Sequence, residues 1–176
     1  MTRRAIQVSV IGSSEGEPEL LRKAEEVGTL IAEAGATLVC GGLTGVMEAA
    51  SRGAASAGGV VIGVLPTLQP ADANEHVTHA VATGIGHARN LSVVASGDAV
   101  IAVGGEWGTL SEIAFARKLQ RPVVAIESWS LRDRAGTDLG IVEAKTPTDA
   151  VKAALSSAVT EEPSFERTEA ADETLD

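Results

Sequence analysis

Aromatic residues are scarce in this chain, which has no tyrosine, two phenylalanines and two tryptophans among 176 residues. The hydrophobic fraction is nevertheless 44%, and alanine and valine supply much of it. That fraction excludes a wholly disordered chain, because enough apolar surface is available to offset the entropy lost on folding. We therefore expect one domain whose substantial core is built from small aliphatic side chains in closely packed helices and strands.

Cysteine and histidine are scarce as well. Cys40 is the single cysteine, so an internal disulfide is excluded, and its apolar surroundings predict a buried structural thiol. His76 and His79 lack a third metal ligand nearby in the sequence, and we predict no metal site. No apolar run approaches the ~20 residues of a membrane helix. Residues 1–4 lead directly into a strand pattern, so we expect no signal peptide, no membrane contact and a cytoplasmic location.

Acidic residues outnumber basic ones by 24 to 14, which gives a formal net charge of −10. Residues 160–176 are especially acidic, and Arg167 is their only base. We predict a Rossmann-like nucleotide- or phosphate-binding domain over residues 1–159 and a solvated, disordered tail over 160–176. The absence of a basic stripe argues against a DNA-processing module and against other nucleic-acid partners.

Apolar, β-branched segments alternate with segments of helical periodicity along the predicted domain. Strand patterns fall at 5–11, 36–40, 59–65, 77–82, 98–102, 122–126 and 140–142, and helical patterns at 18–34, 46–57, 86–96, 109–119 and 147–159. Strands that alternate with helices through short turns predict a parallel sheet with helices on both faces. The predicted fold class is therefore α/β, a single-domain Rossmann-like sheet.

Three of the predicted strands end in glycine-rich turns that lead into helices. The polar and glycine residues of these turns are Gly12 and Ser13, then Gly41, Gly42, Thr44 and Gly45, then Gly104, Gly105, Gly108 and Thr109. Parallel strands end at one edge of a sheet, so we expect the turns to line a ligand crevice there. Free N–H groups and helix dipoles at such turns favour a phosphate. The turns contain neither the dinucleotide-binding pattern nor a P-loop, which excludes a conventional NAD site.

The same turns also have a purely structural interpretation. Thr109 and Glu112 have the spacing of a helix-capping box, as do Ser14 and Glu17. A capping box stabilises a helix start and needs no ligand. On this interpretation the glycine turns connect strands to helices and bind nothing.

Two further residues and one segment have two interpretations each. Arg89 and Asn90 are polar residues at the start of an otherwise apolar helix. Arg89 is either an ordinary surface residue or a fork for phosphate or carboxylate. Trp129 lies in segment 127–145, where the pattern is weak, and it either packs over a loop or covers a ligand edge. The polar segment 66–76 is either a plain surface loop or a flap over a site.

The sequence Gly104-Gly105-x-x-Gly108-Thr109-x-x-Glu112 resembles the Pro-Gly-Gly-x-Gly-Thr-x-x-Glu signature of the Lonely Guy-type proteins, formerly named lysine decarboxylases. Residues 41–47 resemble the second glycine turn of that family, and Arg89 matches the arginine of its Arg-Lys pair. The Arg-Asn pair at 89–90 and residues 97–101 resemble the branch of molybdenum cofactor carrier proteins, which is distantly related to DprA. The resemblance covers about residues 5–158.

This resemblance implies a carrier or sensor that binds a nucleotide or a molybdopterin-type cofactor. The implied ligand-binding residues are Gly12, Ser13, Gly41, Gly42, Thr44, Gly45, Arg89, Asn90, Gly104, Gly105, Gly108, Thr109 and Glu112. It also implies a homo-oligomer, a dimer or tetramer, packed through the helices at 89–96 and 109–119.

The alternative that the resemblance implies is a phosphoribohydrolase, which cleaves the N-glycosidic bond of a nucleoside 5′-monophosphate. Arg89 and Glu112 would then be catalytic, because a carboxylate near the anomeric carbon stabilises an oxocarbenium-like transition state. Val103 and Asn90 stand where the hydrolases carry proline and lysine. These two departures favour the carrier or sensor over the enzyme.

Overall fold

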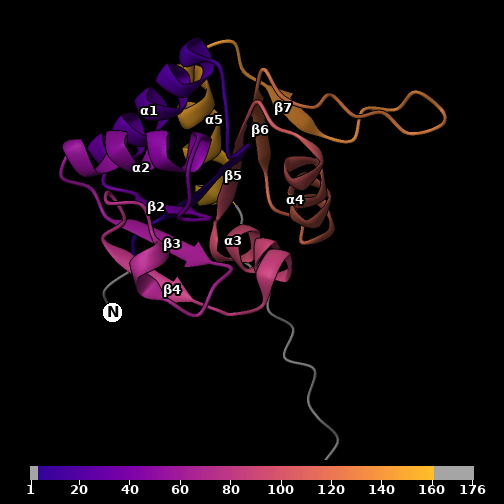
Figure 1. Ribbon diagram of the computed structural model, residues 1–176. Helices are drawn as coiled ribbons and strands as arrows, with labels where there is room; N and C mark the ends of the chain where they lie inside the picture. The colour runs from indigo at the N-terminus through magenta and orange to yellow at the C-terminus, as the bar shows by residue number, and fades with distance from the viewer. Residues whose placement is uncertain (1–3, 161–176) are drawn as a thin grey trace, which may run out of the picture.

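A sheet of seven parallel strands runs through the centre of the computed structural model, which describes residues 4–160 (Figure 1). The strands are β1 (Gln7–Gly12), β2 (Thr37–Cys40), β3 (Val61–Leu65), β4 (His79–Ala82), β5 (Ala99–Val103), β6 (Val123–Ile126) and β7 (Ile141–Glu143). The α-helices are α1 (Pro18–Glu33), α2 (Val46–Ser56), α3 (Asn90–Ser96), α4 (Trp107–Lys118) and α5 (Pro147–Thr160). The predicted α/β, Rossmann-like class is confirmed.

The strands lie in the order β4-β3-β2-β1-β5-β6-β7. The chain builds outward from β1 to β4, then crosses to the other side of β1 and builds outward again to β7. The order therefore reverses between β1 and β5, where Gly12 pairs with Val103 in the parallel ladder. Such a reversal leaves a crevice beyond the carboxyl ends of the two strands, because their following segments turn to opposite faces of the sheet.

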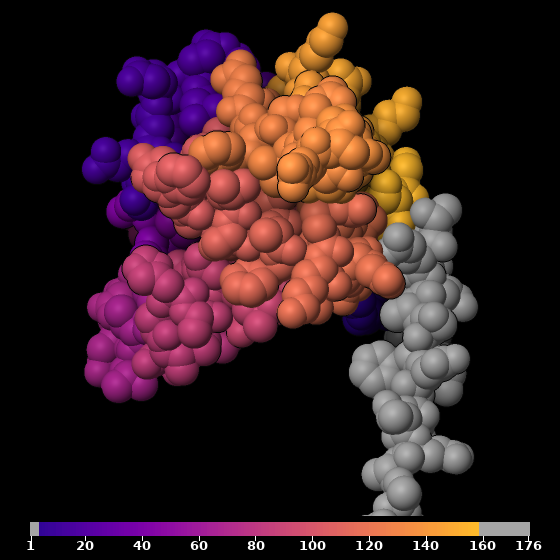
Figure 2. All heavy atoms as spheres, turned by 90° about the vertical axis from the view of Figure 1, so that its right-hand side faces the viewer, coloured from indigo at the N-terminus to yellow at the C-terminus, as the bar shows by residue number. Residues whose placement is uncertain are grey.

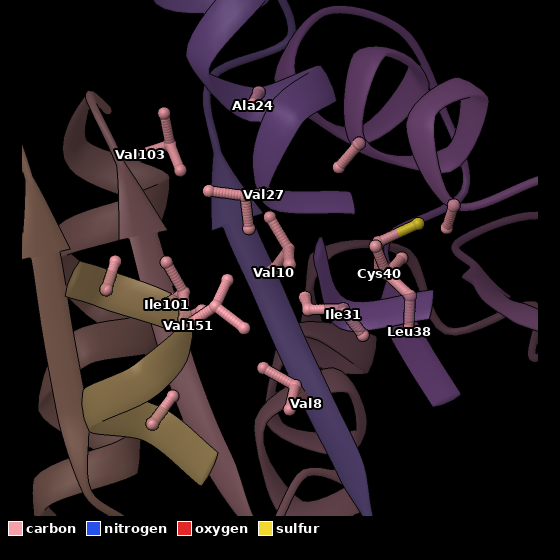
Figure 3. Close-up of a cluster of buried hydrophobic side chains, with 14 of the residues drawn as sticks. Val8, Val10, Ala24, Val27, Ile31, Leu38, Cys40, Ile101, Val103 and Val151 are labelled. Atoms are coloured by element: carbon pink, nitrogen blue, oxygen red, sulfur yellow. The ribbon is translucent and has the colours of Figure 1, made fainter. Parts of the chain in front are cut away.

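Helices α1, α2 and α5 cover one face of the sheet and enclose the larger core cluster (Figure 3). Val10 of β1, Ile31 of α1 and Val151 of α5 are among its members. Helices α1 and α2 cross very closely because glycine stands at the crossing. A Cβ atom on Gly28 would lie 1.9 Å from the carbonyl oxygen of Ala50. The predicted core of small aliphatic side chains is confirmed on this face.

Helices α3 and α4 cover the opposite face and pack on the second core cluster. This cluster includes Val93 of α3 and Ile113 of α4 together with Ile11 and Val100 of the sheet. The buried Oγ of Ser9 donates to the carbonyl oxygen of Val93 at 2.6 Å and ties β1 to α3. Both faces of the sheet are thus covered, which explains why the central strands are almost continuously apolar.

Both predicted capping boxes are wrong. Helix α1 begins at Pro18 with Glu17 as its N-cap, because the residue before a proline is held extended and proline suits the first helical position. Helix α4 begins at Trp107 with Glu106 as its N-cap, three residues earlier than a Thr109 cap requires. Neither N-cap side chain makes a capping bond to a described residue.

Other element bounds shift modestly from the predicted ones. The helical pattern at 86–96 divides into a 3-10 turn over Gly86–Arg89 and the short helix α3. Segment 127–140 connects β6 to β7 as a projecting loop in which Arg132 and Asp138 form an isolated bridge (Figure 1). Within residues 4–160, no helix is long and apolar enough to cross a membrane. The predicted disordered tail lies outside the described residues, apart from the last residue of α5.

Candidate functional site

The three glycine-rich turns come together at the carboxyl edge of the sheet, around the reversal between β1 and β5. The turn after β2 lies on the turn after β1, because the Val46 N–H donates to the Ser13 carbonyl oxygen at 3.1 Å. The Thr44 hydroxyl donates to the Ser14 carbonyl oxygen at 3.0 Å. The turn after β5 follows Val103, the ladder partner of Gly12. The predicted clustering of the turns is therefore present in the fold.

Two of these turns need glycine for their backbone conformation. Gly45 has a φ of +67°, and a Cβ there would lie 2.3 Å from the carbonyl carbon of Ser14. Gly105 has a φ of +119°, and a Cβ there would lie 2.5 Å from the Cβ of Thr109. Side chains at these positions would be strained. At Gly45 a side chain would also push the turn after β2 away from the turn after β1, and at Gly105 it would displace Thr109 at the start of α4.

The amino end of α4 opens at this edge. Trp107, Gly108 and Thr109 occupy its first three positions, whose N–H groups precede the first helical bond from Leu110 to the Glu106 carbonyl oxygen. A Cβ added to Gly108 would have no neighbour within 4 Å among the described residues. Unused N–H groups, the positive end of the helix dipole and open space make this end suitable for an anion.

Arg89 is the buried cation of the site, with only 7% of its surface exposed. One Nη donates to the Gly41 carbonyl oxygen at 3.3 Å, and the other donates to the Asn90 side-chain oxygen. Its buried Nε–H has no hydrogen-bond partner within residues 4–160. Burial lowers the pKa of Arg89, and the charge of Glu112 partly opposes this change. The guanidinium is therefore held in place with donor capacity unused.

Glu112 is the buried carboxyl group on the same side of the sheet, 6% exposed in the second turn of α4. Burial raises its pKa from 4.5 to about 7, and the nearby Arg89 opposes that rise. The carboxyl group therefore exists in both protonation states near neutral pH. A group of this kind can accept a hydrogen bond from a ligand, donate one to it, or exchange a proton.

The structure places the other predicted residues in supporting positions. Asn90 is buried and orients Arg89, and Thr109 is buried beneath Gly105. The Ser13 hydroxyl donates to the Glu15 carbonyl oxygen, so it serves its own turn. Within the described residues, no group of three or more histidine, cysteine, aspartate or glutamate side chains is placed to hold a metal ion.

Sequence reasoning missed a hollow beside Gly105. Its volume is about 310 Å³, and it is lined by Gly105, Glu127, Ser128, Trp129 and Ser130. Figure 2 faces this side of the molecule and shows segment 127–140, in orange, next to the residues of α4. The hollow was not predictable from the sequence, because segment 127–145 has no clear periodicity. Only Trp129 was a candidate for this region, as a residue that either packs over a loop or covers the edge of a ligand.

The match to the SLOG cluster4 family spans residues 5–156. An uncharacterized protein of Archaeoglobus fulgidus is 42% identical over 156 residues, which cover 89% of this chain and 99% of that protein. The molybdenum cofactor binding protein of Rippkaea orientalis has a TM-score of 0.81 and 36% identity over 90% of this chain and all of its own. The molybdenum cofactor carrier protein of Chlamydomonas reinhardtii has a TM-score of 0.75 and 30% identity over the same shares.

Proposed function

The chain belongs to the SLOG cluster4 family, and we propose that it binds a phosphorylated small molecule as a carrier or sensor. The proposed ligand is a nucleotide or a molybdopterin-type cofactor. The ligand class is supported by two similar structures whose proteins are named for binding or carrying the molybdenum cofactor. The proposed contacts are Gly12, Ser13, Gly41, Gly42, Thr44, Gly45, Arg89, Asn90, Gly104, Gly105, Gly108, Thr109 and Glu112.

The observation that carries this proposal is the buried pair of charges, Arg89 and Glu112. Burying a charged group is costly unless it is paired and fully hydrogen-bonded. Arg89 keeps an unused donor at Nε within the described part of the chain, and the pKa of Glu112 is raised by burial. The stability of the fold therefore does not account for this buried pair. A ligand that accepts a hydrogen bond from Arg89 and forms another with Glu112 would account for it.

In this proposal the phosphate lies on the N–H groups at the start of α4. The sharpest test is Gly108→Asp, because a side chain at Gly108 meets no described atom within 4 Å. An acidic residue in the first turn of a helix normally stabilises it slightly, so the variant is expected to fold while its carboxylate repels the phosphate. Gly105→Asp is a poor test, because the φ of +119° at Gly105 would strain any side chain.

The measurement is isothermal titration of GMP and of ribose 5-phosphate into the wild type, Gly108→Asp and the uncharged control Gly108→Asn. We expect affinity to fall at least tenfold in Gly108→Asp, a loss of about 1.4 kcal/mol, and less in Gly108→Asn. Equal affinities in all three proteins would place the phosphate elsewhere and remove this part of the proposal.

The second candidate is the phosphoribohydrolase, and the pKa of about 7 at Glu112 favours it. A carboxyl group that titrates near neutral pH suits acid–base work at a glycosidic bond. Asn90, which holds Arg89, occupies the place of the hydrolase lysine, so we expect no turnover. The test is release of free base from a panel of nucleoside monophosphates. Clear release by the wild type that disappears in Glu112→Gln would establish the enzyme instead of the carrier.

We also propose that the protein forms a homo-oligomer through α3 and α4. Leu91 of α3, Phe115 of α4 and Leu119, the residue that follows α4, are apolar yet substantially exposed, and Phe115 and Leu119 lie one helical turn apart. Light scattering after size exclusion tests this proposal, with Phe115→Asp expected to shift a dimer or tetramer towards the monomer. Leu139→Asp, at an exposed position of segment 127–140, is the control. A monomeric wild type would contradict the proposal.

The free, buried Cys40 suits a reducing compartment, and we propose the cytoplasm.

A further inference from the structure

The two tryptophans of the chain lie together beside the glycine turn. Their ring centroids are 5.6 Å apart, with an angle of 37° between the ring planes. Trp107 is the first residue of α4, and Trp129 comes from segment 127–140. In a chain with 2% aromatic residues, the only two indole rings thus meet at the edge that carries the proposed phosphate site.

The two rings differ in how they are held. The Trp129 Nε1–H donates to the Glu106 carbonyl oxygen at 3.2 Å, and its ring packs on the core cluster beneath α4. Trp107 is 77% exposed. Burial of such a ring would stabilise the fold through its large apolar area. Because Trp107 remains exposed, it makes little of this contribution. Trp129 is therefore a fixed ring, and Trp107 is a ring without a covering partner among the described residues.

Trp129 is also a wall of the hollow beside Gly105. The hollow's volume of about 310 Å³ lies at the lower end of the ~300–1,000 Å³ typical of small-molecule pockets. Ser128, another wall, has a buried Oγ without a hydrogen-bond partner in the described part of the chain. An apolar ring and an unused hydroxyl group on adjacent walls match a flat ligand that has a polar edge.

The backbone that presents these walls is itself unusual. Glu127 has a φ of +48°, which is uncommon for a residue with a side chain. Its carboxylate forms a 2.5 Å ion pair with Lys23 of α1. This contact fixes the turn that leads from β6 into Ser128 and Trp129, so the walls of the hollow are positioned from both faces of the sheet.

We infer that the hollow beside Gly105 holds a planar bicyclic heterocycle of the phosphorylated ligand, stacked on Trp129 and shielded by Trp107. This inference rests on the proposed function, because it places the ring next to the phosphate at the start of α4. The Ser128 hydroxyl group bonds to the polar edge of the ring. Purines and pterins share the required chemistry, which is a flat aromatic face with nitrogen and oxygen atoms around it.

The test compares ligands with and without the ring. GMP carries a purine, neopterin monophosphate carries a pterin, and ribose 5-phosphate carries neither. We expect Trp129→Leu to weaken the binding of at least one ring-bearing ligand by roughly 10- to 100-fold, the range for one stacked base. Its affinity for ribose 5-phosphate should change less than twofold. Leu139→Ala, in the same segment, is the matched control and should change neither.

A second variant guards against misfolding of Trp129→Leu. Trp107 is exposed, so Trp107→Leu is expected to fold, and it leaves Trp129 as the only tryptophan. We expect GMP or neopterin monophosphate to quench its emission and ribose 5-phosphate to leave it unchanged. The ligand that quenches distinguishes a purine from a pterin.

Two results would overturn the inference. In the first, ribose 5-phosphate binds as tightly as the ring-bearing ligands and Trp129→Leu has no effect, which leaves the phosphate proposal standing. In the second, GMP and neopterin monophosphate bind but both leave the Trp129 emission of Trp107→Leu unchanged, which places the ring away from Trp129. If the wild type binds none of the three compounds, the proposed function fails together with the inference.

Discussion

The two faces of the sheet are packed by different means. Under α1, α2 and α5 the contacts are apolar and very close, with Gly28 and Gly53 at the crossing of α1 and α2. Under α3 and α4 the second apolar cluster is joined by buried polar groups, among them Arg89 and Glu112. The first face is what a stable sheet needs. The second carries buried charges whose desolvation opposes stability.

The largest effect is expected on the apolar face. Gly28→Ala normally would stabilise a helix interior by about 1 kcal/mol. Here the new Cβ would lie 1.9 Å from the carbonyl oxygen of Ala50, so α1 and α2 must separate. We expect a net loss of about 3 kcal/mol in the free energy of unfolding, measured by urea denaturation. A stabilised variant would show that the helices can move apart freely and that the close crossing is dispensable.

The next effect is expected on the polar face and depends on pH. The pKa of Glu112 is about 7 in the folded chain and near 4.5 in the unfolded one. Between these values the folded state binds more protons, so the stability contributed by this group falls as pH rises from about 4.5 to 7. Glu112→Gln removes that loss, and at pH 8 we expect it to be about 2 kcal/mol more stable than the wild type.

The pH dependence is checked by urea denaturation of the wild type and Glu112→Gln from pH 5 to 8. The two stability curves should converge towards pH 5 and diverge above it. Parallel curves would mean that Glu112 titrates normally, in which case its burial needs no ligand to explain it.

Two buried serines give a smaller and more direct comparison of the faces. The Ser9 hydroxyl reaches from β1 to the carbonyl oxygen of Val93 in α3 at 2.6 Å, whereas the Ser51 hydroxyl donates to the Met47 carbonyl oxygen within its own helix and has only a longer, 3.4 Å contact with the Cys40 thiol of β2. We expect Ser9→Ala to cost about 1 kcal/mol and Ser51→Ala to cost less than about 0.5 kcal/mol, since alanine is the better helix former. Thermal unfolding measures both. Equal losses would show that the link between β1 and α3 adds nothing.

The smallest effect is expected at the open end of α4. Gly108→Ala puts a methyl group where no described atom lies within 4 Å, and alanine restricts the unfolded chain. We expect a gain of about 0.5 kcal/mol in stability together with weaker binding of GMP, because the methyl group occupies ligand space. Thermal unfolding and titration of the same sample report the two changes. Unchanged affinity would place the ligand away from Gly108.

The sequence predicted the sheet and the gathering of its turns well, because both follow from local patterns. Apolar runs such as Ala99–Val103 are buried throughout and have one regular partner on each side. Gly104 and Gly105 mark the end of β5, and parallel topology then brings that end beside Gly12. Once the alternation of strands and helices is seen, the placement of these turns follows from general rules.

The helix starts and the hollow were not predictable in the same way. The capping-box pattern at Thr109 competes with a glycine turn that allows α4 to begin at Trp107, and sequence spacing does not rank the two. The burial of Arg89 and Glu112 depends on how α3 and α4 meet, which no local pattern encodes. The hollow depends on a loop that is fixed by the distant contact between Lys23 and Glu127.

The pairing of β1 with β5 joins two segments that the ribosome synthesises several seconds apart. The Gln7 N–H donates to the Asp98 carboxylate across 91 positions of sequence. At roughly 5–20 residues per second, the ribosome finishes the second partner some 5–20 s after the first. We expect the early half of the nascent chain to wait through that interval with one edge of β1 uncovered. A ligand that contacts both strands can bind and stabilise the chain only after β5 has been synthesised. Such a ligand therefore has no effect on the earlier steps of folding on the ribosome.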